Sequence, residues 1–245
     1  MQKKIPSSVW LKLGIIFHWI LLSSTIYNSF RAFNLNFVYQ FGYRQDFQHT
    51  RVKYPLVYDS LNVKLLKDSK KWSYDKLFTD EQAIGILSDG LSKGNVVKEY
   101  VFSWIYAGQK LIKHYYFTKQ EDKWLLTNVV LQKPETTPVK EDLYAFLNKL
   151  CSDSLFQKTR VQFPLEMLTL GENNEVIRKK VTSDKWRYLG FYYKCDSLPI
   201  LRKNEAIGDE CILTIQGVEN GILEICKFKI IKNKWFLVGY EDVST

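Results

Sequence analysis

The chain has 245 residues, of which 46% are hydrophobic, 25% charged and 15% aromatic, and its formal net charge is +9. These fractions are typical of a globular protein and exclude a disordered or low-complexity chain. Four cysteines are too few for a disulfide-built scaffold. The positive charge lies in short scattered groups, which is typical of solvated sheet faces, so we expect no nucleic-acid partner.

An apolar segment lies near the N-terminus. Lys3, Lys4 and Lys12 precede the run LGIIFHWILL at residues 13–22, and two serines follow it. Ten residues of helix rise about 15 Å, half the thickness of a hydrocarbon core, so the run favours a signal peptide over a spanning helix. We therefore predict export with residues 1–27 as the signal peptide. An uncleaved N-terminal anchor and an amphipathic soluble helix stay open as alternatives.

The sequence contains an internal repeat. The motif FQHTRVKYPL at residues 47–56 returns as FQKTRVQFPL at residues 156–165, with seven of ten positions identical. A long period present in only two copies predicts tandem domains rather than a solenoid. We expect a first α+β repeat over residues 28–133 and a second over residues 134–245.

Each repeat is expected to begin with a helix that passes into a strand at the shared motif. In the second repeat Thr137 is a suitable N-cap, Pro138 suits the first helical position, and apolar residues recur at helical spacing over 143–150. The proline of the motif favours a sheet edge or a strand end. A short helical segment is expected around Trp72 and around Trp186.

Three further strands are expected to close each repeat. Alternating and β-branched stretches predict them at 96–107, 110–118, 123–132, 210–217, 222–231 and 234–243. The turn at 171–174 predicts a hairpin that continues into 175–181. Helices packed on one face of a curled antiparallel sheet make an α+β domain.

At the paired FQxTRVx[Y/F]PL motifs, each followed by a tryptophan, the chain resembles a family of uncharacterised exported bacterial proteins, a domain of unknown function with a nuclear transport factor 2-like (cystatin-like) fold. The resemblance covers residues 30–243. It implies two tandem cones, each a curved antiparallel sheet packed on helices and open at one end. Many members are thought to be lipoproteins, and here Ser23 and Ser24 stand where the lipid-bearing cysteine is required. The superfamily contains isomerases, dehydratases and binding modules, so the fold alone does not give the function.

Six residues that recur in register are candidates for ligand binding: Gln48, Arg51, Trp72, Gln157, Arg160 and Trp186. Each arginine could clamp a carboxylate or phosphate, and each tryptophan could stack on a sugar ring. A structural role is favoured instead, because active sites tend to decay in one copy after duplication whereas fold determinants persist in both. The polar residues would then tie the helix end to backbone carbonyls, and the tryptophans would anchor the core or a domain interface.

The remaining reactive residues give weaker signals. A disulfide between Cys195 and Cys211 is preferred, because closing a flexible loop of about 15 residues would add about 3 kcal/mol of stability. Cys226 is expected to be a buried free thiol. His49 and His114 lack histidine counterparts, so we expect them at surface or strand positions. The sequence contains no metal-ligand pattern and no glycine-rich phosphate loop, so we predict neither a metal nor a cofactor.

These observations favour a non-enzymatic binding module in the periplasm or cell envelope of a Gram-negative bacterium. Its partner would be an unknown small molecule, peptide or glycan, with membrane contact only through an uncleaved N-terminal segment. The alternative is an enzyme of isomerase or hydro-lyase type, with a buried carboxylate in one cone and a tyrosine opposite it as oxyanion donor. A structural envelope protein is a third reading.

Overall fold

The computed structural model describes residues 35–61, 63–68, 72–77, 83–89, 97–106, 109–133, 140–173, 175–190, 197–217 and 220–245. The predicted signal peptide lies outside these residues, as do Thr137, Pro138, Cys195 and the predicted boundary after residue 133. Among the helices that the structure describes, none has the length and apolar character needed to cross a membrane.

The described chain contains two helix pairs, each followed by six strands. The helices are α2 (Leu35–Tyr43), α3 (Gln45–Thr50), α4 (Leu143–Ser152) and α5 (Ser154–Thr159). The first six strands are β1 (Val52–Ser60), β2 (Val63–Lys67), β3 (Ala83–Ser88), β4 (Glu99–Tyr106), β5 (Leu111–Gln120) and β6 (Lys123–Gln132). The last six are β7 (Val161–Leu170), β8 (Val176–Val181), β9 (Ser197–Lys203), β10 (Glu210–Gly217), β11 (Leu223–Ile231) and β12 (Lys234–Asp242). We call the described residues from α2 to β6 the first half and those from α4 to the C-terminus the second half.

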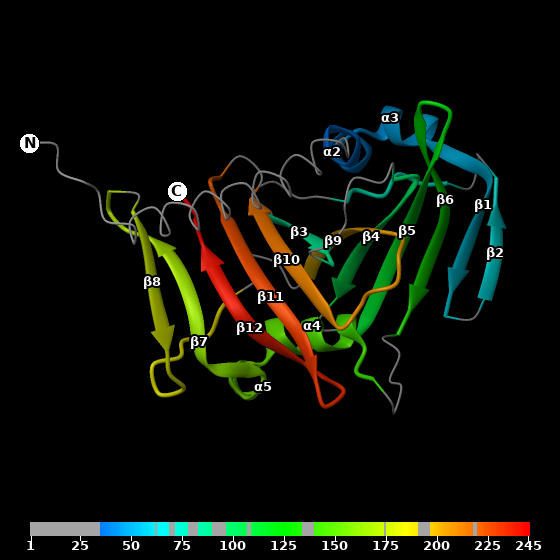
Figure 1. The fold of residues 1–245 in the computed structure, drawn as a ribbon. Helices are drawn as coiled ribbons and strands as arrows, with labels where there is room; N and C mark the ends of the chain where they lie inside the picture. The colour runs from blue at the N-terminus through cyan, green and yellow to red at the C-terminus, as the bar shows by residue number, and fades with distance from the viewer. Residues whose placement is uncertain are drawn as a thin grey trace, which may run out of the picture.

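The strands form one mixed sheet in the order β2-β1-β6-β5-β4-β9-β3-β10-β11-β12-β7-β8 (Figure 1). The third strand of each half, β3 or β9, pairs with strands of the other half. β9 pairs antiparallel with β4, β3 pairs antiparallel with β10, and β3 and β9 pair in parallel with each other at the centre. The order is symmetric: if β1 to β6 are exchanged with β7 to β12 in turn, the list is the same when it is followed from the opposite end. We expected a separate sheet in each repeat, but the two halves share one sheet by exchanging a strand.

We expected a purely antiparallel sheet, but the sheet is mixed. Besides β3 with β9, β1 pairs in parallel with β6, and β7 pairs in parallel with β12. Both of these pairings contain a register shift, between Val52 and Val57 in the first half. Pro55 lies within that interval, and Pro164 lies within the corresponding one in β7. Proline cannot donate to a strand ladder, so it is tolerated where the pairing is interrupted. The motif proline therefore marks a bulge in an inner strand rather than a sheet edge.

The helices of the two halves lie on opposite faces of the sheet, with α2 and α3 on one side and α4 and α5 on the other (Figure 1). Strand β4 contacts both layers. Phe102 belongs to the core that contains Phe37 and Phe41 of α2, whereas Ile105 belongs to the core that contains Phe146 of α4. Because neighbouring residues of a strand point to opposite faces, the two cores lie on opposite sides of β4.

Helix α4 begins five residues later than Pro138, the predicted first helical position. Asp142 is the N-cap, and its side chain accepts a hydrogen bond of 2.7 Å from the backbone N–H of Ala145. The predicted apolar face is confirmed, since Phe146, Leu147 and Leu150 are buried.

The other predicted elements have mixed outcomes. Strands β4, β5, β6, β10, β11 and β12 and the hairpin of β7 with β8 confirm the predicted strands and hairpin. The segments 72–77 and 186–190 are irregular, so the helical segments predicted around Trp72 and Trp186 are wrong. Side-chain hydrogen bonds to the backbone of 72–77, described below, take the place of a helical ladder.

Candidate functional site

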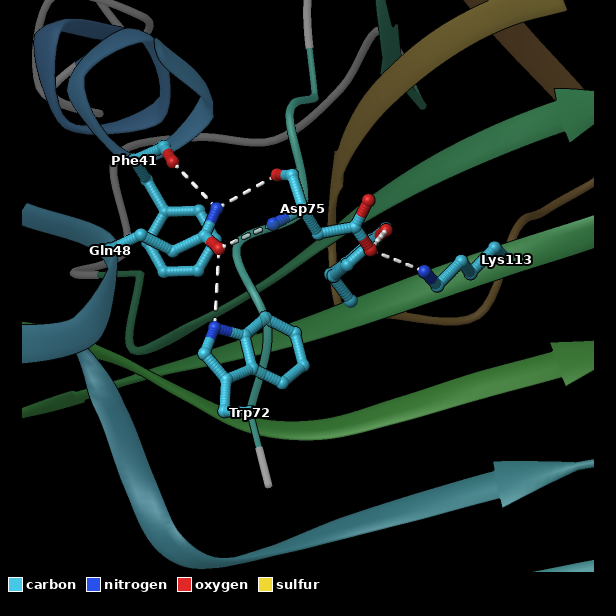
Figure 2. Close-up of polar contacts among 6 residues, drawn as sticks. Phe41, Gln48, Trp72, Asp75 and Lys113 are labelled. Atoms are coloured by element: carbon cyan, nitrogen blue, oxygen red, sulfur yellow. Dashed lines mark hydrogen bonds and ion pairs between the residues drawn. The ribbon is translucent and has the colours of Figure 1, made fainter. Parts of the chain in front are cut away.

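Gln48 joins the end of the helix pair to the segment that contains Trp72. Its Nε2 donates to the carbonyl oxygens of Phe41 and Asp75, both at 2.9 Å. Its Oε1 accepts from the backbone N–H of Asp75 at 2.8 Å and from Trp72 Nε1 at 3.2 Å (Figure 2). Gln48 is fully buried, and these bonds use both donors and both acceptor positions of its amide. No hydrogen-bonding position of this side chain is left for a ligand.

Gln157 makes nearly the same contacts in the second half. Its Nε2 donates to the carbonyl oxygens of Leu150 and Leu189 at 3.0 Å, and its Oε1 accepts from the backbone N–H of Leu189 at 2.8 Å. Trp186 differs from Trp72, since its Nε1 is buried and has no hydrogen-bond partner in the part of the chain that the structure describes. Its ring instead meets Phe163 edge-on, with 5.8 Å between centroids.

The two motif arginines lie at the predicted helix-to-strand junctions but have different contacts. Arg160 forms a two-bonded ion pair with Glu141, at 2.8 and 2.9 Å, and donates to the carbonyl oxygen of Trp235 at 3.2 Å. The guanidinium of Arg51 lies 4.9 Å from the centroid of the Phe47 ring, and its Nε is buried without a hydrogen-bond partner among the described residues. The six recurring residues thus remain in separate groups, and only Gln48 and Trp72 are hydrogen-bonded to each other.

A different set of side chains gathers on the α2 side of the first half. We call it the Asp75 cluster: Tyr58 of β1, Asp75, Tyr106 of β4, and Lys113 and Tyr115 of β5. Asp75 Oδ2 accepts a hydrogen bond of 2.5 Å from the Tyr115 hydroxyl and forms an ion pair with Lys113 Nζ (Figure 2). Lys113 Nζ also lies 5.0 Å from the centroid of the Tyr115 ring and 5.9 Å from that of Tyr58. Solvent reaches this pair, since the Asp75 side chain is 32% exposed and the Lys113 side chain 15%.

Several polar groups of the Asp75 cluster are open. Asp75 Oδ1 and the hydroxyls of Tyr58 and Tyr106 have no hydrogen-bond partner among the described residues, and Lys113 uses only one of its three N–H donors. Burial and the nearby charge of Asp75 raise the pKa of Tyr106 to about 12. Burial, followed by the same charge, raises the pKa of Tyr115 well above its ordinary value. Both phenols therefore stay neutral at physiological pH.

The second half lacks this cluster. Leu189 is the counterpart of Asp75. The backbone N–H of each of these residues donates to the motif glutamine of its own half at 2.8 Å. Strand pairing aligns the other positions: Phe102 faces Tyr115 as Leu213 faces Cys226. The counterparts of Tyr58, Asp75, Tyr106, Lys113 and Tyr115 are Met167, Leu189, Gly217, Glu224 and Cys226.

The residues that the two repeats share do not indicate the Asp75 cluster, because its members are not shared. A signal for it was present in the residues that they do not share. The segment WSYD at 72–75 aligns with WRYL at 186–189, so a carboxylate follows one tryptophan and a leucine follows the other. A polar residue in one copy and an apolar one in the other indicates a position that the fold leaves free.

A second buried polar group lies on the opposite face of the same strands. Ser103 Oγ is 2.8 Å from His114 Nδ1 and 3.3 Å from the hydroxyl of Tyr144 in α4, and Arg202 of β9 donates to that hydroxyl at 2.8 Å. The strand position of His114 is confirmed, but the side chain is buried. Burial, followed by the charge of Arg202, lowers the pKa of His114 to about 4. Because Ser103 is fully buried, this group joins the halves and is not open to a substrate.

Three cysteines lie within the described residues, and all are buried free thiols: Cys151, Cys211 and Cys226. The expectation for Cys226 is confirmed. Burial raises the pKa of the Cys211 thiol to about 12. Cys211 has no disulfide partner among the described residues, and because Cys195 lies outside them the preferred Cys195–Cys211 pairing stays a prediction. Within the described ranges, no three His, Cys, Asp or Glu side chains are grouped to hold a metal ion.

Comparison with solved structures identifies a similar protein. It is an NTF2-like protein from Bacteroides fragilis, whose crystal structure was determined at 2.15 Å resolution. The two chains are 25% identical, the match covers 86% of this chain and 96% of that one, and the TM-score is 0.67. This likeness shows an NTF2-like fold built on a mixed sheet with few helices. A comparison with curated proteins finds no match.

A family model described as a domain of unknown function, DUF4348, matches residues 28–242. The match spans both copies of the repeated motif and both helix pairs that the structure describes. It confirms the resemblance that the motifs indicated, and the chain therefore belongs to the DUF4348 family.

Proposed function

We propose that the protein is an exported, non-enzymatic binding module of the cell envelope and that its ligand occupies the Asp75 cluster. One observation carries the proposal. The first half holds a carboxylate, an ammonium group and phenols with open hydrogen-bonding positions, where the second half holds mostly apolar side chains. The fold does not require a feature that only one half contains, so a separate reason must account for it.

The N-terminal segment supports the exported location. Its short apolar run at residues 13–22 suits a signal peptide that delivers the chain to the periplasm or envelope of a Gram-negative bacterium. N-terminal sequencing of the mature protein is expected to find a start between Ser24 and Phe33. A start at Met1 in a soluble cytosolic fraction would contradict export.

We also propose that the two halves, residues 28–133 and 134–245, arose by duplication of one cone. The repeated motif and the symmetric strand order support a common origin. Under this proposal the gene for a single cone was doubled, and only the first copy acquired the Asp75 cluster.

An enzyme of isomerase or hydro-lyase type is the second candidate, because Asp75 and Tyr115 are a carboxylate and a phenol side by side in a partly exposed group. Their geometry favours binding over catalysis. Tyr115 is fully buried and already donates to Asp75, so it cannot also donate to a developing oxyanion on a substrate. Asp75 is held by Lys113 through the same oxygen, which leaves Oδ1 as an acceptor for a ligand.

Native mass spectrometry of protein purified from its host envelope tests the proposal. The wild type is expected to carry a bound small molecule that Asp75→Asn loses. Glu224→Gln, at the position of Lys113 in the second half, is the matched control and is expected to keep it. Thermal unfolding of each variant confirms that the fold is intact. A wild type without any adduct, or an adduct that survives Asp75→Asn, contradicts the proposed site.

A further inference from the structure

We infer that the ligand of the Asp75 cluster is a neutral, hydroxyl-bearing small molecule with the chemistry of a monosaccharide. The inference rests on the proposed function and goes beyond it by naming the chemical class. Two properties of the cluster carry it: the balance of its charges, and the kind of hydrogen-bonding groups that it leaves open.

The charges of the cluster already balance. Asp75 and Lys113 form an ion pair, so the exposed part of the site has one negative and one positive charge. An anionic ligand placed at Asp75 Oδ1 would face a carboxylate, and Lys113, the cation of the cluster, is already paired with that carboxylate. A cationic ligand at the same oxygen would face Lys113, and Lys67 lies 4.1 Å from the centroid of the Tyr58 ring. A charged group brought into such a site loses hydration without finding an unshared counter-charge, which is unfavourable.

The open groups suit hydroxyls. Asp75 Oδ1 requires a donor, Lys113 supplies two donors, and the hydroxyls of Tyr58 and Tyr106 each donate and accept. A ligand hydroxyl also does both, so a compound with several hydroxyls can pair with the donors and with the acceptors of the cluster. A purely apolar ligand would leave the carboxylate oxygen and the ammonium group unpaired, at a cost in binding.

The protonation of the phenols supports this class. Because burial and the charge of Asp75 keep Tyr106 in its neutral form, its hydroxyl remains a donor. The Tyr106 hydroxyl therefore adds no second negative charge to the site at physiological pH.

Isothermal titration of the mature full-length protein with matched sugars tests the inference. The probes are glucose, galactose and mannose, each beside its uronate and its 2-amino derivative, so that shape is kept while charge changes. At least one neutral sugar is expected to bind, and its uronate and amino derivative to bind at least about tenfold more weakly. Asp75→Asn is expected to weaken the neutral sugar at least about tenfold, because the oxygen acceptors of Asp75 change, whereas Glu224→Gln leaves it unchanged.

Failure of the inference can be distinguished from failure of the proposed function. If no neutral sugar binds, or if a charged derivative binds as tightly as its neutral parent, the inference is wrong. The proposed function survives that result if the native protein still carries an adduct that Asp75→Asn loses. The mass of that adduct then identifies a ligand of another class.

Discussion

The two halves of the sheet have the same order of helices and strands but differ in the side chains that they place at equivalent positions. Gln48 and Gln157 make equivalent hydrogen bonds, whereas Asp75 is replaced by Leu189 and His114 by Ile225. A contact present in both halves is one that the fold uses twice. A contact present in one half is free to serve a ligand or the junction between halves. The comparison therefore separates residues that maintain the fold from residues that can bind a ligand or join the two halves.

The largest effect is expected when a shared contact is removed. Gln48→Leu and Gln157→Leu keep the side-chain volume but leave several buried backbone groups unpaired, each at a cost of about 1–3 kcal/mol. We expect each variant to lose about 3 kcal/mol or more of unfolding free energy, with Gln48→Leu the more severe because Trp72 Nε1 also loses its acceptor. Urea denaturation measures this. A loss below about 0.5 kcal/mol in either variant would show that the glutamines do not maintain the fold.

The next effect concerns His114, which only the first half contains. Its folded-state pKa of about 4 lies below its ordinary value of 6.5, so the folded state favours the neutral ring. Its contribution is fully present above about pH 6.5 and falls as the pH decreases toward 4, by about 3 kcal/mol in all. Tyr116, Tyr144 and Arg202 are the other titratable groups facing the ring.

Urea denaturation between pH 4 and pH 7 tests this, with His114→Ile as the comparison because isoleucine occupies the equivalent position 225. The wild type is expected to lose more stability than the variant over this interval. Equal pH dependence of the two proteins would mean that His114 is not neutral in the folded state. The variant's own lower stability at pH 7, caused by the loss of the bond to Ser103, does not affect this comparison of slopes.

A smaller effect is expected at the motif arginines. From the sequence alone, Arg51→Ala and Arg160→Ala should destabilise equally. The contacts indicate otherwise, since removing Arg160 leaves Glu141 without its two-bonded partner. We expect a loss of about 2 kcal/mol for Arg160→Ala and about 1 kcal/mol or less for Arg51→Ala. Calorimetric unfolding of both variants gives the difference, and equal midpoints would overturn the ranking.

The smallest effect on stability is expected at Asp75. The Asp75–Lys113 pair is partly exposed, so Asp75→Asn is expected to change the unfolding free energy by less than about 1 kcal/mol while it abolishes ligand binding. Thermal unfolding and titration of the same sample separate the two quantities. A loss of stability as large as that of Gln48→Leu would place Asp75 among the residues that maintain the fold.

The sequence predicts most of the strands but not β3 and β9, which pair at the centre of the sheet. Strand β11 alternates between apolar and charged residues because one of its faces meets a core and the other meets solvent. Strand β3, with the sequence AIGILS, is buried on both faces by the two helix layers, so it has no alternation to detect. Its partner β9 belongs to the other half, and no local pattern reveals an exchange between segments that are far apart in the chain.

The candidate site was accessible to sequence reasoning only in part. The motif glutamines and the helix-to-strand junction were found because they recur. Asp75 is brought to Lys113 and Tyr115 by the irregular segment that Gln48 holds, and that segment was expected to be helical. A short stretch fixed by side-chain hydrogen bonds from elsewhere in the chain carries no periodicity of its own.

The exchange of β3 and β9 has a consequence for the order in which the chain is made. Strand β4 borders β9, which is synthesised only after the whole first half, the connecting segment 134–139 and the strands β7 and β8. Until then the edge of β4 is an unpaired row of backbone donors and acceptors, open to misassociation with another chain. Transport of an unfolded chain to the envelope, followed by folding once all twelve strands have arrived, would avoid exposing that edge in the crowded compartment where synthesis takes place.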